Sequence, residues 1–278
     1  MDLNTIQEIR HPASADSVRN WEPGFAWLAG GTWLFSEPQL ETNTLIDLAA
    51  LGWPALTVSP EGLEIAATCK IVELDQFSAP AEWRAASLFR ECCRSYLASF
   101  KIWNMATVGG NIVMSLPAGP MISLTVALEG VCMLWPRGGK PREVAVVDFV
   151  TDNHKNVLAP GELLRSIRLP ASALKKSYAF RRFSLVHMGR SEVLLIGTLC
   201  PERGTLLLTI TAATKRPIQF RFDAVPTAGE LKRTIDDGIS AEMYFDDPNG
   251  SPSHRQHLSY YYAEQIRQEL SVDSKVTP

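Results

Sequence analysis

Two glycine pairs are the residues whose type and spacing most clearly suit ligand binding. The first lies in the segment Trp27-Leu28-Ala29-Gly30-Gly31-Thr32-Trp33, directly after a short apolar run. A glycine pair permits backbone torsions and close approaches that a side chain would block, so successive N–H groups can face an anion such as a pyrophosphate. The hydroxyl of Thr32 adds a further donor. The segment is neither a G-x-G-x-x-G fingerprint nor a Walker A loop, and an ordinary glycine turn stays open as the alternative.

The second pair, Gly109 and Gly110, stands between the hydroxyl of Thr107 and the carboxamide of Asn111. Polar groups at a bend suit the hydroxyls of a ribose or ribityl chain, as well as phosphates. A structural bend is again the alternative interpretation. Because both segments offer backbone and side-chain donors, the two together favour one shared ligand.

Other chemistry finds little support in the residues. No Ser-His-Asp order or paired-carboxylate motif stands out, so we expect no catalytic residue in this chain. His254 and His257 lie three apart, but no companion ligand motif supports a metal site, and we interpret them as solvated surface. The five cysteines are odd in number and include no C-x-x-C, which argues against a disulfide framework and a cysteine-built metal centre.

Composition excludes further classes of protein. The net charge of −3 provides no positive field for nucleic acid or an anionic membrane surface. The N-terminus lacks the basic start and apolar run of a signal peptide, and no apolar stretch is long enough to cross a bilayer. With cysteines interpreted as reduced thiols, we expect a cytoplasmic protein.

The elements that must position the glycine pairs follow from the apolar patterns. Short apolar runs flanked by Gly and Pro predict strands before residue 60, and the turn at 59–62 predicts a hairpin. The apolar residues of segment 80–100 recur three or four apart, which predicts a helix leading towards the second pair. A helix is predicted at 122–128 and a strand at 131–135.

A boundary between two domains is predicted near residue 174, where a strand that ends in proline gives way to small and basic residues. The length of 278 residues agrees with about two domains. Beyond the boundary we expect strands and then helices, in an α+β unit. The predicted strands are 178–183, 193–200, 205–212 and 218–222, and the predicted helices are 228–236 and 254–270.

Three motifs in order carry a resemblance to a known family. They are L-A-G-G-T at 28–32, N-x-A-T-V-G-G-N at 104–111 with a following P-A-G, and P-G-E-L-L-x-x-I-x-L-P at 160–170. The chain resembles the FAD-binding medium subunit of the molybdenum hydroxylases, the family of xanthine dehydrogenase and carbon monoxide dehydrogenase. The resemblance covers nearly the whole chain.

The resemblance implies a fold and a set of cofactor contacts. Residues 1–174 would form an FAD-binding PCMH-type (vanillyl-alcohol-oxidase-like) domain of two α+β subdomains. Residues 175–278 would form an α+β domain like the C-terminal domain of the carbon monoxide dehydrogenase flavoprotein. The implied FAD-binding residues are Trp27, Leu28, Ala29, Gly30, Gly31, Thr32, Trp33, Thr107, Gly110, Asn111, Leu164 and Arg181. The segment 27–33 would wrap the pyrophosphate, Leu164 would pack near the isoalloxazine or adenine ring, and Arg181 would lie near the flavin.

The resemblance also implies an electron-transfer function in a heteromeric complex. A molybdopterin-binding large subunit would oxidise a substrate, and the iron-sulfur clusters of a small subunit would pass electrons to the FAD, which would deliver them to NAD+ or another acceptor. The chain departs from the family pattern at Trp33, where many relatives have Asp or Glu, and at Pro120, where they have Asp. These departures leave open the alternative of a flavin-free structural or assembly subunit. A stand-alone flavin oxidoreductase that shares the flavin fold is a second alternative.

Overall fold

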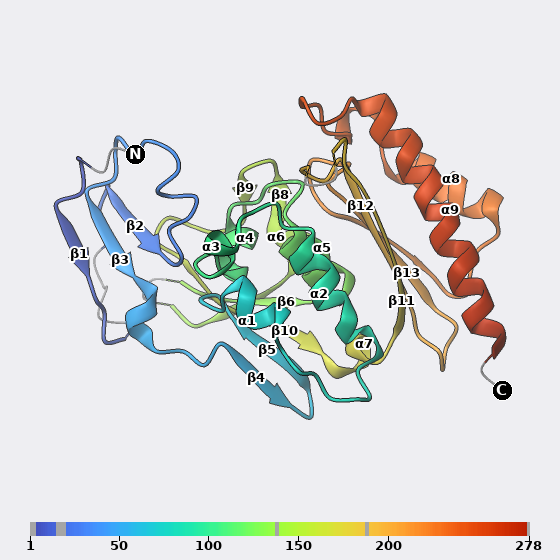
Figure 1. Cartoon of the computed structure of the whole chain (residues 1–278), viewed down its shortest axis with the longest axis horizontal. Helices are drawn as coiled ribbons and strands as arrows, with labels where there is room; N and C mark the ends of the chain where they lie inside the picture. Colours follow the sequence, from blue (N-terminus) through green and yellow to red (C-terminus); the bar gives the residue numbers. More distant parts are fainter. Residues whose placement is uncertain (1–3, 15–20, 137–138, 187–188, 277–278) are drawn as a thin grey trace.

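Three main sheets follow one another along the length of the molecule, in the order in which the chain forms them (Figure 1). The computed structural model describes residues 4–14, 21–136, 139–186 and 189–276. The first sheet is parallel, with β3 between the two others; its strands are β1 (Glu8–Arg10), β2 (Phe25–Leu28) and β3 (Thr44–Asp47). Because β2 ends at Leu28, it delivers the first glycine pair at its carboxyl end.

The second sheet is antiparallel and has the order β4-β5-β10-β6-β7. Its strands are β4 (Leu56–Ser59), β5 (Gly62–Ala66), β6 (Val131–Trp135), β7 (Arg142–Ala145) and β10 (Leu163–Pro170). The predicted hairpin is confirmed, because Ser59 pairs with Gly62 across its turn. Gly62 has φ of +138°, a backbone conformation that side chains rarely adopt.

Short helices pack beside this sheet and connect it to the glycine segments (Figure 1). They are α1 (Ile71–Asp75), α2 (Ser87–Arg94), α3 (Phe100–Trp103), α4 (Val108–Val113), α5 (Pro120–Ala127), α6 (Val146–Phe149) and α7 (Ala171–Leu174). Smaller elements are the 3-10 turns Leu48–Leu51, Arg84–Ala86 and Ala241–Met243 and the strand pair β8 (Val150–Asp152) and β9 (Lys155–Asn156).

The single helix predicted for residues 80–100 is wrong in extent. Only Ser87–Arg94 is α-helical, and α3 begins a separate turn at Phe100. The residues that give the apolar spacing face the core up to Cys92, whose side chain is fully buried, but Phe100 is 73% exposed. The core-facing stripe therefore ends before the residues that continue its spacing, and no packing holds a longer helix together.

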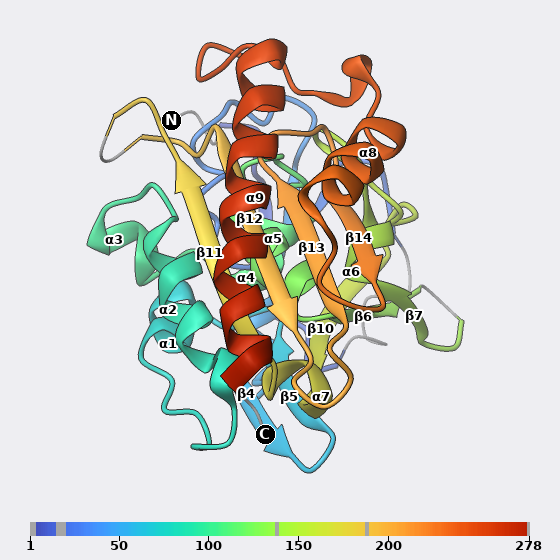
Figure 2. The ribbon, with the colours of Figure 1, turned by 90° about the vertical axis from the view of Figure 1, so that its right-hand side faces the viewer.

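The third sheet is antiparallel in the order of the sequence and confirms all four strands predicted after the boundary. They are β11 (Ser177–Phe183), β12 (Val193–Leu199), β13 (Leu206–Thr211) and β14 (Ile218–Phe222). The helices α8 (Ala228–Gly238) and α9 (Pro252–Val276) lie on one face of this sheet, with α9 running along it (Figure 2). The opposite face packs on α5.

This arrangement buries β12 on both faces, which explains its uninterrupted apolar sequence. Leu194 and Ile196 belong to the core of the preceding unit, whereas Leu195 packs in the core under α8 and α9. A hydrogen bond of 2.6 Å between the hydroxyls of Ser123 and Thr211 ties α5 to β13 inside this contact. The two halves of the chain are thus joined by a shared, buried layer.

All five cysteines are free thiols, and Cys69, Cys92, Cys93 and Cys132 are buried. Burial raises the pKa of the Cys93 and Cys132 thiols to about 12, so both stay protonated at neutral pH. Among the helices that the structure describes, none combines the length and apolar character required to span a membrane.

Candidate functional site

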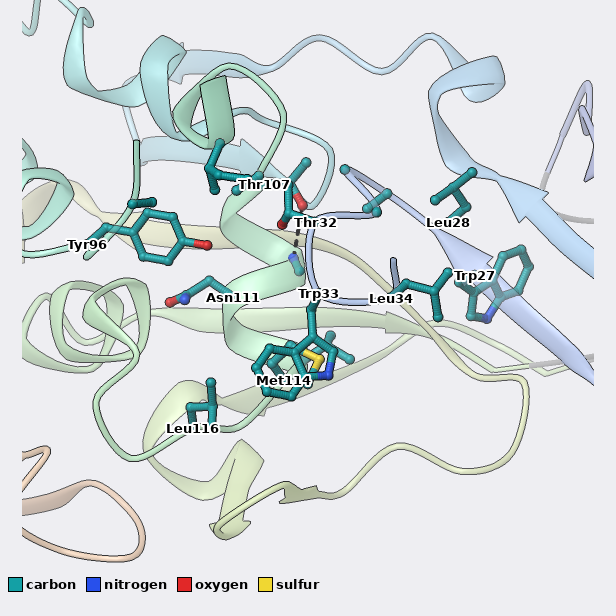
Figure 3. Close-up of a pocket in the computed structure, with 18 of the residues that line it drawn as sticks. Trp27, Leu28, Thr32, Trp33, Leu34, Tyr96, Thr107, Asn111, Met114 and Leu116 are labelled. Atoms are coloured by element: carbon teal, nitrogen blue, oxygen red, sulfur yellow. Dashed lines mark hydrogen bonds between the residues drawn. The ribbon is translucent and has the colours of Figure 1, made fainter. Parts of the chain in front are cut away.

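The two glycine segments meet at one pocket of about 330 Å³ (Figure 3). Ten of the twelve residues that the sequence indicates for cofactor binding line it: Trp27, Leu28, Ala29, Gly30, Gly31, Thr32, Trp33, Thr107, Gly110 and Asn111. The remaining lining residues are Leu34, Tyr96, Leu97, Ala98, Ile102, Ala106, Val113, Met114 and Leu116. Segments far apart in the sequence therefore build one cavity.

Gly30 of the first glycine segment packs against the backbone of Met105, which lies shortly before the second glycine pair. A Cβ atom on Gly30 would lie 1.9 Å from the carbonyl oxygen of Met105, so no other residue fits without a backbone shift. Gly31 follows with φ of +68°, in the left-handed region that favours glycine. Each of the two positions therefore requires glycine, Gly30 for lack of space and Gly31 for its backbone conformation.

Four consecutive backbone N–H groups of the first segment, residues 30–33, donate no hydrogen bond to any residue in the described ranges. The turn is closed instead by its carbonyl groups, since Gly31 accepts from the N–H of Phe35 and Trp33 accepts from the N–H of Ser36. Backbone donors without protein partners at a pocket wall are the groups that bind a phosphate oxygen.

The second segment forms the short helix α4 with Thr107 as its N-cap. The Thr107 Oγ1 accepts a hydrogen bond of 3.0 Å from the N–H of Gly110. Gly109 packs directly on Ala67, where a Cβ would approach to 2.5 Å. Asn111 uses its Oδ1 to accept from the N–H of Met121 at 3.1 Å, and its Nδ2 donors have no partner among the described residues. Asn111 is therefore oriented by α5 and keeps two donors for a ligand.

Tyr96 is the lining residue that sequence reasoning missed most clearly. It lies in segment 80–100, whose apolar spacing predicts one continuous helix, but it follows the end of α2 and its hydroxyl interacts with the side chain of Thr32. Burial raises the pKa of Tyr96, with a smaller opposing effect from Thr32. Its position shortly before the second glycine pair is the one signal in the sequence that pointed to the pocket.

No charged side chain from the described ranges lines this pocket. Its walls are apolar and aromatic, and Figure 3 shows Trp33 beside Met114 and Trp27 at the end of the first segment. The Nε1 of Trp27 is buried and has no hydrogen-bond partner in the described part of the chain. Trp33 is 39% exposed, and its ring centroid lies 5.5 Å from that of His154. The pocket is thus a neutral cavity rich in N–H donors.

Two of the predicted cofactor residues do not line the pocket. Leu164 is buried in the core at the start of β10. Arg181 is on β11, where its guanidinium donates to Gln265 at 2.8 Å and to Glu269 at 2.5 Å, both on α9. These contacts hold Arg181 on the sheet face that α9 covers. Pro120 is buried at the first position of α5, next to the Asn111 contact.

The described residues contain no group of three or more metal-ligating side chains. The predicted solvated surface at His254 is only partly correct, because its Nδ1 lies 2.6 Å from Oε1 of the buried Glu192. His257 stacks on Tyr261 with a centroid distance of 6.5 Å. Neither histidine contacts the neutral pocket.

Comparison with known proteins adds a family and a set of similar folds. A family model described as the FAD binding domain in molybdopterin dehydrogenase matches residues 7–172. No curated protein matches the chain. The structure of quinoline 2-oxidoreductase from Pseudomonas putida 86 is similar over 99% of both chains, with a TM-score of 0.77 and 17% identity.

Two further solved structures are similar to nearly the whole chain. Carbon monoxide dehydrogenase from Oligotropha carboxidovorans has a TM-score of 0.78 and 20% identity, over 96% of this chain and 98% of that chain. Carbon monoxide dehydrogenase from Hydrogenophaga pseudoflava, in a form that lacks the Mo-pyranopterin moiety, has a TM-score of 0.76 and 18% identity, over 94% and 96%. At these identities the likeness concerns the fold, and it confirms the predicted fold class.

Proposed function

Because this chain belongs to the FAD-binding family of the molybdopterin dehydrogenases, we propose that it is the flavin-carrying, electron-transferring subunit of a molybdenum hydroxylase complex. Its proposed partners are a small iron-sulfur subunit, which delivers electrons, and a large molybdopterin-binding subunit, which oxidises the substrate. The proposed final acceptor is NAD+ or another oxidant. The free thiols support a complex that works in the reducing cytoplasm.

The observation that supports this proposal best is the convergence of both glycine segments on one neutral pocket. Its volume of about 330 Å³ lies in the range of roughly 300–1,000 Å³ typical of ligand sites. The residues present fit FAD. The unpartnered N–H groups of residues 30–33 suit a pyrophosphate, and none of the described lining residues is a carboxylate that would repel it.

The proposed roles of the chain's own residues follow from their free donors. The backbone of residues 30–33 would hold the two phosphates, and the Nδ2 of Asn111 would donate to a sugar or ribityl hydroxyl. Trp27 and Trp33 would exclude water from the cofactor. Bound FAD supplies the exchange of electrons, while the protein positions it and sets its surroundings.

The contacts of Leu164 and Arg181 reduce the set of residues that we propose to bind the cofactor. Since neither lines the pocket, we propose that the cofactor is held by the two glycine segments and the residues around Tyr96. We keep the proposal of a domain boundary near residue 174, which is supported by the separate hydrophobic core under α8 and α9.

The decisive experiment is cofactor analysis of the purified chain, alone and after copurification from cells that contain its neighbouring subunits. We expect a flavin absorbance spectrum and release of about one FAD per chain on denaturation. Iron, acid-labile sulfide and molybdenum should appear only in the copurified complex. A folded chain that holds no flavin in either preparation would overturn the proposal and favour the flavin-free assembly subunit.

A further inference from the structure

A second cavity, of about 560 Å³, lies at the junction of the two halves and shares no residue with the neutral pocket. Its charged lining comes from four segments: Glu129, Lys175, Lys176, Glu202, Arg203 and Arg221. We name it the basic pocket. Figure 2 shows α7, which precedes the two lysines, and the turn between β12 and β13 at the same end of the sheet. The hydroxyls of Ser172 and Thr205 complete the polar lining.

Glu129 fixes two of the cationic groups in place. Lys176 is buried and its Nζ donates to one carboxylate oxygen of Glu129, while Arg221 donates to the other oxygen at 2.5 Å. The hydrogen bonds from Lys176 and Arg221 outweigh the burial of Glu129 and lower its pKa, so the carboxyl group is ionised at neutral pH. An ammonium group has three donors and a guanidinium has five. Both cations therefore keep donors beyond those that Glu129 uses.

The other two cations have no fixed partner. Neither Lys175 nor Arg203 forms an ion pair within 4.0 Å of a carboxylate in the described ranges, and Glu129 is already paired with Lys176 and Arg221. The hydrogen bond from Cys200 is the main cause of the lowered pKa of Glu202, and the charge of Lys175 is only a minor cause. Glu202 is the nearby carboxylate, and it accepts from the Cys200 thiol at 3.1 Å. Four cations thus face one cavity with two carboxylates, and one of these is already bonded to two of the cations.

We propose that the basic pocket binds a small anion carrying at least two phosphate groups. Phosphate oxygens match the fork of an arginine and the point charge of a lysine. Two phosphates carry enough charge to use both the fixed pair, Lys176 and Arg221, and the unpaired Lys175 and Arg203. Ser172 and Thr205 add hydroxyl donors at neutral positions.

The lining decides which part of such a ligand is recognised. Among the residues placed by the structure, no aromatic side chain on which a nucleobase could stack lines it. The basic pocket would therefore contact the phosphates alone, and a nucleoside attached to them would extend into solvent. Because residues before and after position 174 both line it, a bound anion holds the two halves of the chain together.

The test is calorimetric titration of the purified full chain with inorganic pyrophosphate and with ADP, at constant ionic strength. We expect both to bind, and saturating pyrophosphate to raise the melting temperature of the chain. The double variant Lys175→Gln with Arg203→Gln should weaken binding about tenfold or more, because two charge-assisted contacts are lost. The matched double variant Arg90→Gln with Arg233→Gln removes two exposed cations elsewhere and should bind as the wild type does.

Each other outcome has a defined meaning. Equal affinities for pyrophosphate and ADP support recognition of phosphates alone, and tighter binding of ADP supports a nucleotide as their source. No binding of either anion at millimolar concentration, or equal losses in both double variants, would overturn the proposal. Tighter binding of a hexaglutamate peptide than of pyrophosphate would also overturn it, in favour of an acidic protein segment. The flavin content of every variant is measured, so a failure of the basic pocket is distinguishable from a failure of the flavin site.

Discussion

Gly30 lies so close to Met105 that a Cβ atom would stand 1.9 Å from its carbonyl oxygen. This contact fixes the first glycine segment against the residues that lead into the second. The neutral pocket therefore depends on the absence of one side chain, as well as on the groups that line it.

Replacing Gly30 by Ala should damage the pocket and the fold together. The added methyl group forces the backbone apart, at a cost of roughly 1–3 kcal/mol in the free energy of unfolding. Flavin content after purification should fall with it. Gly229→Ala is the matched control, because a Cβ there has no heavy atom within 4 Å. Urea denaturation and flavin absorbance measure both effects, and equal stability of the two variants would contradict the argument.

Tyr96 and Thr32 both line the pocket, and Thr32 lies near enough to the Tyr96 hydroxyl to offset part of the rise in pKa that burial causes, so Tyr96→Phe tests this contact without removing the ring. Loss of one neutral hydrogen bond is worth about 0.5–1.5 kcal/mol, which predicts a flavin dissociation constant raised by roughly two- to tenfold. Thr32→Val should have a similar effect, and the double variant should add little to either. Fluorescence titration of the flavin-free chain with FAD measures this cycle. Fully additive losses would show that the two hydroxyls act separately.

Much of this architecture was accessible from the sequence, for local reasons. The turn at 59–62 and the alternation around it specify a hairpin. A pair of adjacent glycines in the sequence indicates a backbone that must approach its neighbours closely or adopt a positive φ, and the structure has both at Gly30 and Gly31. Tyr96 was missed because its spacing continues the apolar period of α2, whereas the helix ends at Arg94. What ends the period is the exposure of Phe100, which depends on the tertiary fold.

Arg181 and Leu164, which the resemblance places near the flavin, lie away from the pocket in this structure. A strand presents alternate residues to opposite faces, but which face is covered by which element depends on packing far along the chain. Arg181 is directed by Gln265 and Glu269 on α9, which lie 84 and 88 residues further along the chain. Leu163 and Leu164 are both buried, and the pairing of β10 with β6 shifts register after Leu164. Alternation of apolar residues therefore cannot predict on which face of the sheet the Leu164 side chain lies.

Glu162, in the P-G-E-L-L motif, should make stability depend on pH. Its carboxylate is buried and accepts two hydrogen bonds of 2.7 Å from Arg142, which lower its pKa. A lowered folded-state pKa contributes stability that is present above the unfolded value of about 4.5 and is lost as the pH falls through the folded value.

The Glu162→Gln variant removes this titration. We expect a loss of roughly 1–3 kcal/mol at pH 7 and a flatter decline of stability below pH 5 than in the wild type. Urea denaturation at a series of pH values provides the comparison. Glu143→Gln is the control, since Glu143 pairs with Arg168 at the surface, where both side chains are about half exposed. Parallel pH profiles for wild type and Glu162→Gln would rule out this role.

Gly197 on β12 supports the packing of α9 by leaving room for Ile266. A Cβ at Gly197 would lie 2.3 Å from Cγ2 of Ile266 and 2.9 Å from Cδ1 of Leu270. Gly197→Ala should therefore cost roughly 1–3 kcal/mol by overpacking. Ile266→Ala alone should cost about 2–5 kcal/mol, because it opens a cavity in a fully buried site.

The two changes should compensate in part when they are combined. The methyl group added at Gly197 occupies space that the truncation of Ile266 vacates, so the double variant should lose less stability than the sum of the single variants. Urea denaturation of all four proteins gives the coupling free energy directly. A coupling of zero would contradict this argument, because it would mean that α9 moves away from the sheet instead of packing on Gly197.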